Sequence, residues 1–182
     1  MKKALLVIDV QMALADEDAS GTERSCPEAE QNIAALLDKF RSAEDQVVHI
    51  HHHGTDPDDP FHPDASGSAV QPVAAPTAGE PVVIKTNSSG FVGTSLQSIL
   101  QDAGVEQVIL CGATANHCVE STTRSAADLG FQPTYVSDAV WTYGITGPDG
   151  VPHSAARIHS VSMATLEGEI AAVKCTKDIL AM

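Results

Sequence analysis

The nine residues Cys111-Gly-Ala-Thr-Ala-Asn-His-Cys-Val119 join an apolar run to a segment of helical composition. Residues 105–112, which overlap the start of this stretch, are rich in β-branched side chains and end in glycine, which is typical of a buried strand that leaves a sheet. Residues 119–130 are long enough for about three helical turns and end in a glycine suited to the position after a helix. We therefore expect Cys118 at a sharp turn from a strand into a helix.

A thiol in such a turn has two chemical advantages. Unpaired backbone N–H groups and the positive end of the helix dipole converge there, so Cys118 is expected to ionise more readily than a free thiol of pKa ~8.5. The same N–H groups can hold an oxyanion that develops on a substrate carbonyl. The alternative is a structural role, because free cysteine usually behaves as a small buried hydrophobe.

Two more reactive side chains follow predicted strands. Residues 4–8 form a continuous apolar run, which is typical of a strand buried on both faces of a parallel sheet, and Asp9 follows directly. Residues 80–85 predict a further strand with Lys85 at its carboxyl end. The carboxyl ends of parallel strands share one edge, where open α/β sheets bind ligands, so Asp9, Lys85 and Cys118 are candidates for one site. For Asp9 alone, a turn-capping role is the alternative.

The remaining segments alternate between strand and helix patterns. This alternation predicts a single α/β domain over residues 1–182, with a three-layer α/β/α, Rossmann-like arrangement of about six parallel strands and helices on both faces. Residues 12–26 are expected to be irregular, and a loop is expected from 138 onward. Further strands are predicted at 46–50, 132–137 and 171–175, and helices at 27–41, 94–104 and 153–167.

Composition and charge exclude several classes of partner. The formal net charge is -14, with 24 acidic against 10 basic residues, so nucleic acid and anionic membranes are not expected to bind. The four cysteines form no Cys-x-x-Cys pair, which favours a reducing compartment. The apolar run after Met1 is too short for a signal-peptide core or a bilayer span. A cytoplasmic protein is therefore expected.

Residues 54–80 form a long segment rich in Pro, Gly, Asp, Ala and Ser. A structureless stretch of this length indicates a functional loop, a lid or disorder. The histidine-rich region 49–62 and its neighbouring aspartates raise the hypothesis of a metal site, although their spacing matches no recognised zinc pattern. A solvated polar loop with one histidine lining a pocket is the alternative, and we predict neither a metal nor a cofactor.

If the three strands are neighbours, the chemistry follows from the residue types. Asp9 would take the proton of the Cys118 thiol while Lys85 stabilises the anions. The thiolate would attack a carbonyl carbon, and Asp9 would return the proton to a leaving amine, which leaves a thioester. Water activated by Asp9 would then hydrolyse the thioester.

Four motifs support this interpretation: Val7-Ile-Asp-Val-Gln11, Gly79-Glu-Pro-Val-Val-Ile-Lys85, Ser89-Gly-Phe91 with Thr94 and Leu96 after it, and Gly112-Ala-Thr-Ala-Asn-His-Cys-Val119. Together they resemble the isochorismatase-like superfamily of cysteine hydrolases, which includes nicotinamidases and N-carbamoylsarcosine amidohydrolase. The resemblance covers nearly the whole chain, including residues 130–139 and the predicted helix at 159–166.

The resemblance implies a set of roles. Asp9, Lys85 and Cys118 match the family's catalytic triad, and a non-proline cis peptide is expected between Ala113 and Thr114. That bond would turn the Thr114 N–H, beside the N–H of Cys118, toward the substrate oxygen as an oxyanion hole. A homo-oligomer, either a dimer or a tetramer, is also implied. The candidates for lining the substrate pocket are Gln11, Phe91, Asn116, His117, Trp141 and Tyr143; for the last two, simple packing against the loop is the alternative.

The departures from the family pattern narrow the function. Nicotinamidases carry an Asp-x-His metal motif after the second strand, whereas His49-Ile-His-His-His53 lacks that aspartate. Members that cleave the isochorismate vinyl ether lack the cysteine, so Cys118 favours hydrolysis of a C–N bond in a small neutral amide, ureido compound or lactam. Two other hypotheses stay open: a catalytically idle binding or assembly subunit, and a redox-sensing thiol with Cys111 as the resolving cysteine.

Overall fold

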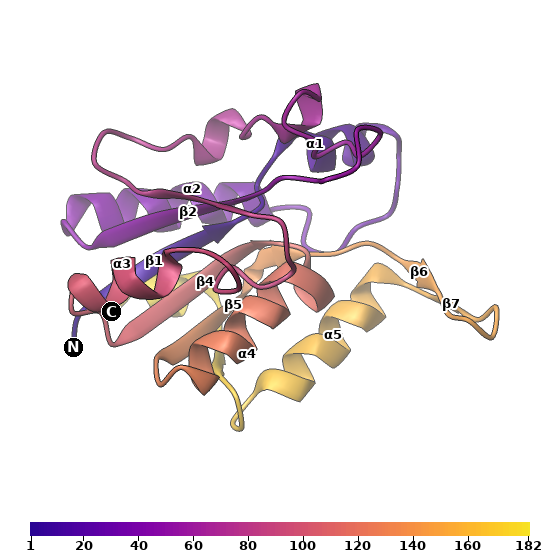
Figure 1. Ribbon diagram of the computed structural model, residues 1–182. Helices are drawn as coiled ribbons and strands as arrows, with labels where there is room; N and C mark the ends of the chain where they lie inside the picture. Colours follow the sequence, from indigo (N-terminus) through magenta and orange to yellow (C-terminus); the bar gives the residue numbers. More distant parts are fainter.

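A six-stranded parallel sheet forms the centre of the computed structural model, which describes all of residues 1–182 (Figure 1). The strand order is β3-β2-β1-β4-β5-β8. The strands are β1 (Lys3–Ile8), β2 (Gln46–His52), β3 (Val82–Lys85), β4 (Gln107–Ala113), β5 (Gln132–Trp141) and β8 (Ala172–Lys174), and a separate two-stranded hairpin is made of β6 (Ile145–Thr146) and β7 (Pro152–His153).

Helices cover both faces of this sheet, as Figure 1 shows for α2 on one side and α4 and α5 on the other. One core lies under α3, α4 and α5, and the other lies under α1, α2 and α6. The predicted three-layer α/β/α arrangement is therefore confirmed. The helices are α1 (Met12–Ala19), α2 (Ala29–Ser42), α3 (Leu96–Asp102), α4 (Glu120–Asp128), α5 (Ala155–Leu166) and α6 (Thr176–Leu180).

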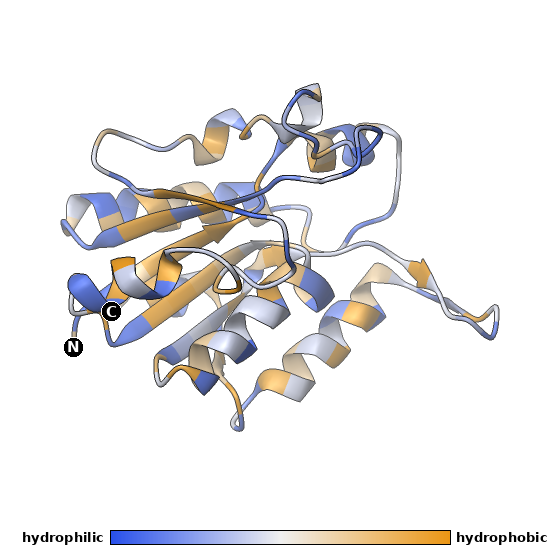
Figure 2. Cartoon of the chain, in the orientation of Figure 1, coloured by the Kyte–Doolittle hydropathy of each residue, from blue (hydrophilic) through white to orange (hydrophobic).

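The central strands are apolar because helices bury both of their faces. In β1, Leu6 packs into the core under α4 and its neighbour Leu5 packs into the core under α2, and both side chains are fully buried. Leu6 lies in register between Val48 of β2 and Leu110 of β4. Figure 2 shows these strands as apolar ribbons between more polar helix surfaces and loops. No helix of the chain combines the length and the apolar character needed to cross a bilayer.

Four features differ from the sequence predictions. The segment expected to be irregular contains α1, whose Ala13 and Leu14 are buried. The strand predicted to end at residue 137 continues to Trp141, because the Asp138 side chain accepts two hydrogen bonds of 2.7 Å from Thr176, at the start of α6, and does not open a loop. The hairpin β6–β7 and the short helix α6 were not predicted.

The long segment 54–80 folds back over the end of β1. It contains two 3₁₀ turns, Ser66–Ser68 and Pro72–Ala74. Its backbone is tied to the residues after β1, since Gln71 N–H donates to the Val10 carbonyl at 2.9 Å and Met12 N–H donates to the Ala69 carbonyl at 2.8 Å. This segment therefore lies beside the sheet edge at which Asp9 is found.

Candidate active site

The fold brings Asp9, Lys85 and Cys118 together at the carboxyl edge of the sheet. Asp9 follows β1, Lys85 is the last residue of β3, and Cys118 lies in the turn after β4. The Lys85 Nζ atom is 2.8 Å from Asp9 Oδ2 and 3.2 Å from Cys118 Sγ. Asp9 and Lys85 are only 3% and 1% exposed, so their ion pair is shielded from water. We refer to these three residues as the Asp-Lys-Cys cluster.

The backbone at Asp9 aims its side chain into the cluster. The residue has a φ of 51°, a left-handed conformation that is uncommon for residues other than glycine. Its N–H donates to the Ile50 carbonyl at 2.8 Å, and its own carbonyl accepts from the Gln11 N–H at 2.9 Å. The second carboxylate oxygen, Oδ1, is buried without a hydrogen-bond partner. An unsatisfied buried acceptor of this kind is costly and is available to take up a proton.

The turn that carries Cys118 begins at a glycine that no other residue could replace without rearrangement. Gly112 has a φ of 115°, and a Cβ atom there would collide with the backbone carbonyl of Ile8. The peptide bond between Ala113 and Thr114 is cis, which confirms that expectation. The chain then forms a π-helical turn, Ala115–Val119, in which the Val119 N–H donates to the Thr114 carbonyl at 3.3 Å.

The Thr114 N–H donates to no carbonyl or side chain of the protein. It lies at the cap position of the π-helical turn that contains Cys118. Backbone N–H groups left free at the start of a helix point toward whatever anion occupies the site. Thr114 therefore has a free donor at the start of the turn that contains Cys118, and its role in an oxyanion hole stays a prediction of the family resemblance.

The ionisation of the cluster differs from the sequence prediction. Burial, and after it the Asp9 charge, raise the pKa of Cys118 to about 12 against the opposing effect of Lys85. Burial also raises the pKa of Asp9 above its ordinary value, again against the effect of Lys85. The prediction of a readily ionised thiol was wrong for the resting protein, because Cys118 is largely buried and lies beside a carboxylate. One negative charge next to Lys85 is favourable, whereas two are not.

Comparisons with known proteins place the chain in a family. The family model described as the isochorismatase domain matches residues 3–173. The chain belongs to the isochorismatase family. It is thus a hydrolase of that family, which includes amidase relatives.

Related proteins of the isochorismatase family match nearly the whole chain. The Bacillus subtilis protein YrdC, an uncharacterised member, is 35% identical over 179 residues, which are 98% of this chain and 95% of that protein. A crystal structure of a family member from Chromobacterium violaceum has a TM-score of 0.93 at 36% identity, over 99% of this chain and 92% of that one. The N-carbamoylsarcosine amidase of Thermoplasma acidophilum has a TM-score of 0.74 at 26% identity, over 97% of each chain.

Three of the pocket candidates of this isochorismatase-family protein are buried in its interior. The Gln11 side chain is fully buried and bonds only to backbone, donating to the Ser68 carbonyl at 2.8 Å and the His52 carbonyl at 3.0 Å and accepting from the His52 N–H at 2.8 Å. Phe91 packs in the core against Phe131, with ring centroids 5.8 Å apart. Trp141 has no exposed surface. These placements favour packing for all three.

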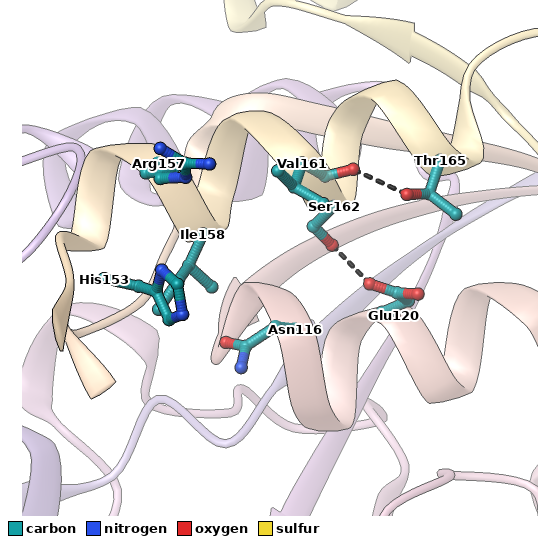
Figure 3. A pocket seen from close by; sticks show the side chains of 8 residues that line it. All are labelled: Asn116, Glu120, His153, Arg157, Ile158, Val161, Ser162 and Thr165. Atoms are coloured by element: carbon teal, nitrogen blue, oxygen red, sulfur yellow. Dashed lines mark hydrogen bonds between the residues drawn. The ribbon is translucent and has the colours of Figure 1, made fainter. Parts of the chain in front are cut away.

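The other three candidates lie nearer to solvent, and their hydrogen bonds are to residues outside the Asp-Lys-Cys cluster. Tyr143 donates through its hydroxyl to Asp18 of α1 at 2.8 Å. His117 is exposed and its Nδ1 lies 3.2 Å from the Thr114 hydroxyl. Asn116 accepts from the Thr142 hydroxyl at 2.6 Å. It also lines a groove of about 400 Å³ between α4 and α5, which Figure 3 shows and which no member of the Asp-Lys-Cys cluster lines.

The histidines of β2 alternate between the two faces of the strand, so His49 and His51 share one face and His52 lies on the other. His49 is fully buried, and its Nε2 lies 2.9 Å from Glu80 Oε2. The rings of His49 and His51 meet edge to face, with centroids 6.3 Å apart. No group of three or more His, Cys, Asp or Glu side chains is arranged to hold a metal ion. The Glu80 carboxylate forms hydrogen bonds with Arg41 and His49, so its oxygens already have partners within the protein.

One residue next to the cluster was not singled out by the sequence analysis. His52 is the last residue of β2, and its Nδ1 lies 3.4 Å from Lys85 Nζ. The rule that selected Asp9 and Lys85, a polar side chain at the carboxyl end of a parallel strand, selects His52 as well. Three other histidines, at 49, 51 and 53, lie near His52 in the sequence. Composition alone does not tell which of the four side chains points toward the site.

Proposed function

We propose that this protein is a cysteine-dependent hydrolase of a C–N bond in a small neutral molecule, namely an amide, a ureido compound or a lactam. The observation that carries the proposal is the contact of one buried ammonium group, Lys85, with both the Asp9 carboxylate and the Cys118 sulfur. This arrangement suits an acid–base residue and a nucleophile that share a counter-ion. The likeness to a protein named as an amidase supports the bond type.

The first half-reaction begins with transfer of the Cys118 proton to Asp9. This transfer keeps a single negative charge beside Lys85, so it moves charge within the site without adding any. The sulfur then forms a bond to the substrate carbonyl carbon, and the N–H groups of Thr114 and Cys118 stabilise the oxyanion. When the C–N bond breaks, Asp9 gives its proton to the leaving nitrogen, and a thioester to Cys118 remains.

The second half-reaction restores the resting site. Asp9, again a carboxylate, takes a proton from water while the water oxygen attacks the thioester carbonyl. The C–S bond breaks, the acid product leaves, and Cys118 recovers its proton from Asp9. Every proton in this sequence moves between substrate, water, Asp9 and Cys118.

The redox alternative has less support. It requires a second thiol that can reach Cys118, and all four cysteines of the chain are free. Cys111 is fully buried and its thiol donates to the Leu6 carbonyl at 3.6 Å. Burial also raises the pKa of Cys111, far above its ordinary value. Cys111 lies within β4 and Cys118 in the turn after it, and the two residues pack in different cores.

The test is hydrolysis of a panel of small amides, ureido compounds and lactams, read as release of ammonia or amine. Cys118→Ala should abolish release and leave the unfolding transition intact, whereas Cys175→Ser, a matched cysteine change remote from β4, should turn over substrate as the wild type does. Rapid quenching followed by intact-protein mass spectrometry should reveal an acyl adduct on Cys118. Hydrolysis that persists in Cys118→Ala would refute the mechanism, and a panel on which the wild type is inert would favour the idle-subunit hypothesis.

A further inference from the structure

Lys85 has three N–H donors and is almost completely removed from water. An ammonium group carries three donors and no acceptor, and a buried donor without a partner is costly. Two of the three directions are occupied by Asp9 at 2.8 Å and Cys118 at 3.2 Å. The remaining contact is His52 Nδ1, at 3.4 Å. Because Lys85 is 1% exposed, bulk solvent does not reach this third donor, and His52 is its nearest protein acceptor.

The position of His52 is set by contacts on both its backbone and its ring. The Gln11 side chain bonds to the His52 N–H at 2.8 Å and to the His52 carbonyl at 3.0 Å. The ring packs edge to face against Phe61 of the segment 54–80, with centroids 5.6 Å apart. His52 is therefore fixed by the residues that follow β1 and by the long loop, and its ring has little freedom to turn from Lys85.

We propose that His52 is a positioning residue for the hydrolysis described above. Its neutral imidazole accepts the third proton of Lys85 through Nδ1, and this holds the ammonium group aimed at Asp9 and Cys118. The proposal requires the tautomer with the proton on Nε2. It rests on the proposed function for its catalytic consequence, while the contact itself can be tested separately.

The electrostatic surroundings of His52 keep it neutral near pH 7. Burial is the main cause that lowers the pKa of His52 below 6.5, and Lys85 of β3 adds to it. Asp9 after β1 and Asp59 in the loop act in the opposite direction, and His53 adds a small lowering effect. Protonation in acid would turn the acceptor into a donor and place a second positive charge beside Lys85. The cluster should then lose its geometry below the ordinary histidine pKa.

The experiment measures the rate of Cys118 alkylation by iodoacetamide from about pH 5 to about pH 9, read by mass spectrometry of the Cys118 peptide. His52→Leu removes the acceptor, His52→Gln keeps an acceptor that does not titrate, and His53→Gln is the matched control. Loss of a hydrogen bond to a charged group predicts a rate about 10-fold lower in His52→Leu near neutral pH. His52→Gln should stay within about 3-fold of the wild type and should lack the additional loss of rate in acid.

Equal rates in His52→Leu and the wild type, with matching unfolding midpoints, would overturn the inference. A separate readout does not depend on reactivity: the ¹⁵N shifts of the His52 ring at neutral pH should show a bare Nδ1 and a protonated Nε2. A proton on Nδ1 would also overturn it. The hydrolysis is judged separately by the substrate panel: if the wild type is inert there while the expected tautomer is present, the proposed hydrolysis fails and the Lys85–His52 contact stands.

Discussion

Lys85 is one cation between two groups that can each carry a negative charge, the Asp9 carboxyl and the Cys118 thiol. The pKa of each acid depends on the charge of the other, and both are raised above their ordinary values. The site therefore holds one anion at a time, on oxygen or on sulfur. Such coupled pairs titrate together, so a change to one residue must alter the ionisation of the other.

Asp9→Asn separates the two roles of this carboxylate. Asparagine cannot carry a proton between thiol and leaving group, so hydrolysis should fall by ~10²–10⁴-fold. The same change removes the charge that helps to raise the pKa of Cys118 and leaves the thiolate as the sole counter-ion of Lys85. Alkylation of Cys118 by iodoacetamide should consequently shift to lower pH. An unshifted alkylation profile would mean that the thiol does not sense the carboxylate.

Gly112 predicts a steric requirement at the start of the reactive turn. Gly112→Ala would place a Cβ against the Ile8 carbonyl while the residue keeps a φ of 115°, so we expect a loss of about 3 kcal/mol or more in the free energy of unfolding. Gly79→Ala is the control, because Gly79 also has a positive φ of 93° but an open surrounding, and about 1 kcal/mol is expected there. Urea titrations of both variants measure the two losses in the free energy of unfolding. A larger loss in Gly112→Ala than in Gly79→Ala would show that the collision with β1 adds to the cost of backbone strain.

At the residue scale, the sequence placed the reactive side chains correctly but not their ionisation. Asp9, Lys85 and Cys118 could be predicted because each follows an apolar run that only a parallel strand explains. The raised pKa of Cys118 could not, because burial and the nearness of Asp9 arise from strands far apart in the chain. The complete burial of Trp141 could not be predicted either. An aromatic residue after a predicted strand shows the same local sequence pattern whether it lines a pocket or packs in a core.

At the level of secondary structure, Arg24 joins three elements around the edge of the second core. Its guanidinium bonds to Glu30 of α2 at 2.8 and 2.9 Å, contacts Asp18 of α1, and lies 4.5 Å from the centre of the Trp141 ring in β5. Arg24→Ala should lower the free energy of unfolding by about 2–3 kcal/mol, because it leaves partly buried carboxylates without their partner. Arg157→Ala, an exposed arginine without an ion pair, should change it by less than about 0.5 kcal/mol. Circular dichroism in urea measures both.

Strand β2 contributes a pH dependence to stability through His51. Burial, with smaller effects of His49 and His53, lowers the pKa of His51 from 6.5 to about 4, so the unfolded chain takes up this proton first as pH falls. The stabilising contribution is complete above about pH 6.5 and is lost toward about pH 4. His51→Gln should reduce the acid-induced loss of stability by roughly 1 kcal/mol, allowing for partial exposure. Urea midpoints at both ends of this window, with His53→Gln as the comparison, give the answer; identical losses in both variants would exclude the effect.

The elements that sequence patterns missed are those that depend on distant partners. The helix α1 is short and acidic, and it is held by burial of Ala13 and Leu14 and by the Met12–Ala69 hydrogen bond to the long loop. The last part of β5 contains Asp138, which reads as a turn residue until its partner Thr176 is known. The strands that were predicted well are the apolar ones in the centre of the sheet, where both faces are covered and the pattern is local.

At the scale of the whole molecule, we expect the protein to be a homo-oligomer. The expectation comes from the family resemblance and from the prevalence of closed symmetric assemblies. The structure also exposes Val161, at 59%, beside the groove between α4 and α5. Sedimentation velocity should show a species at twice or four times 19.0 kDa. A single boundary at the mass of one chain, unchanged as concentration rises, would rule this out.

The strand order has a consequence for synthesis on the ribosome. β1 is the first strand to emerge, yet it lies in the middle of the sheet, between β2 and β4. Its pairing with β2 becomes possible once residue 52 has been made, but the opposite edge must wait for β4, which begins at Gln107. At ~5–20 residues per second, translation leaves that apolar edge uncovered for roughly 3–11 s. During this interval the backbone N–H and C=O groups along that edge of β1 are unpaired and accessible to chaperones and neighbouring chains. Pairing with β4 then covers the edge.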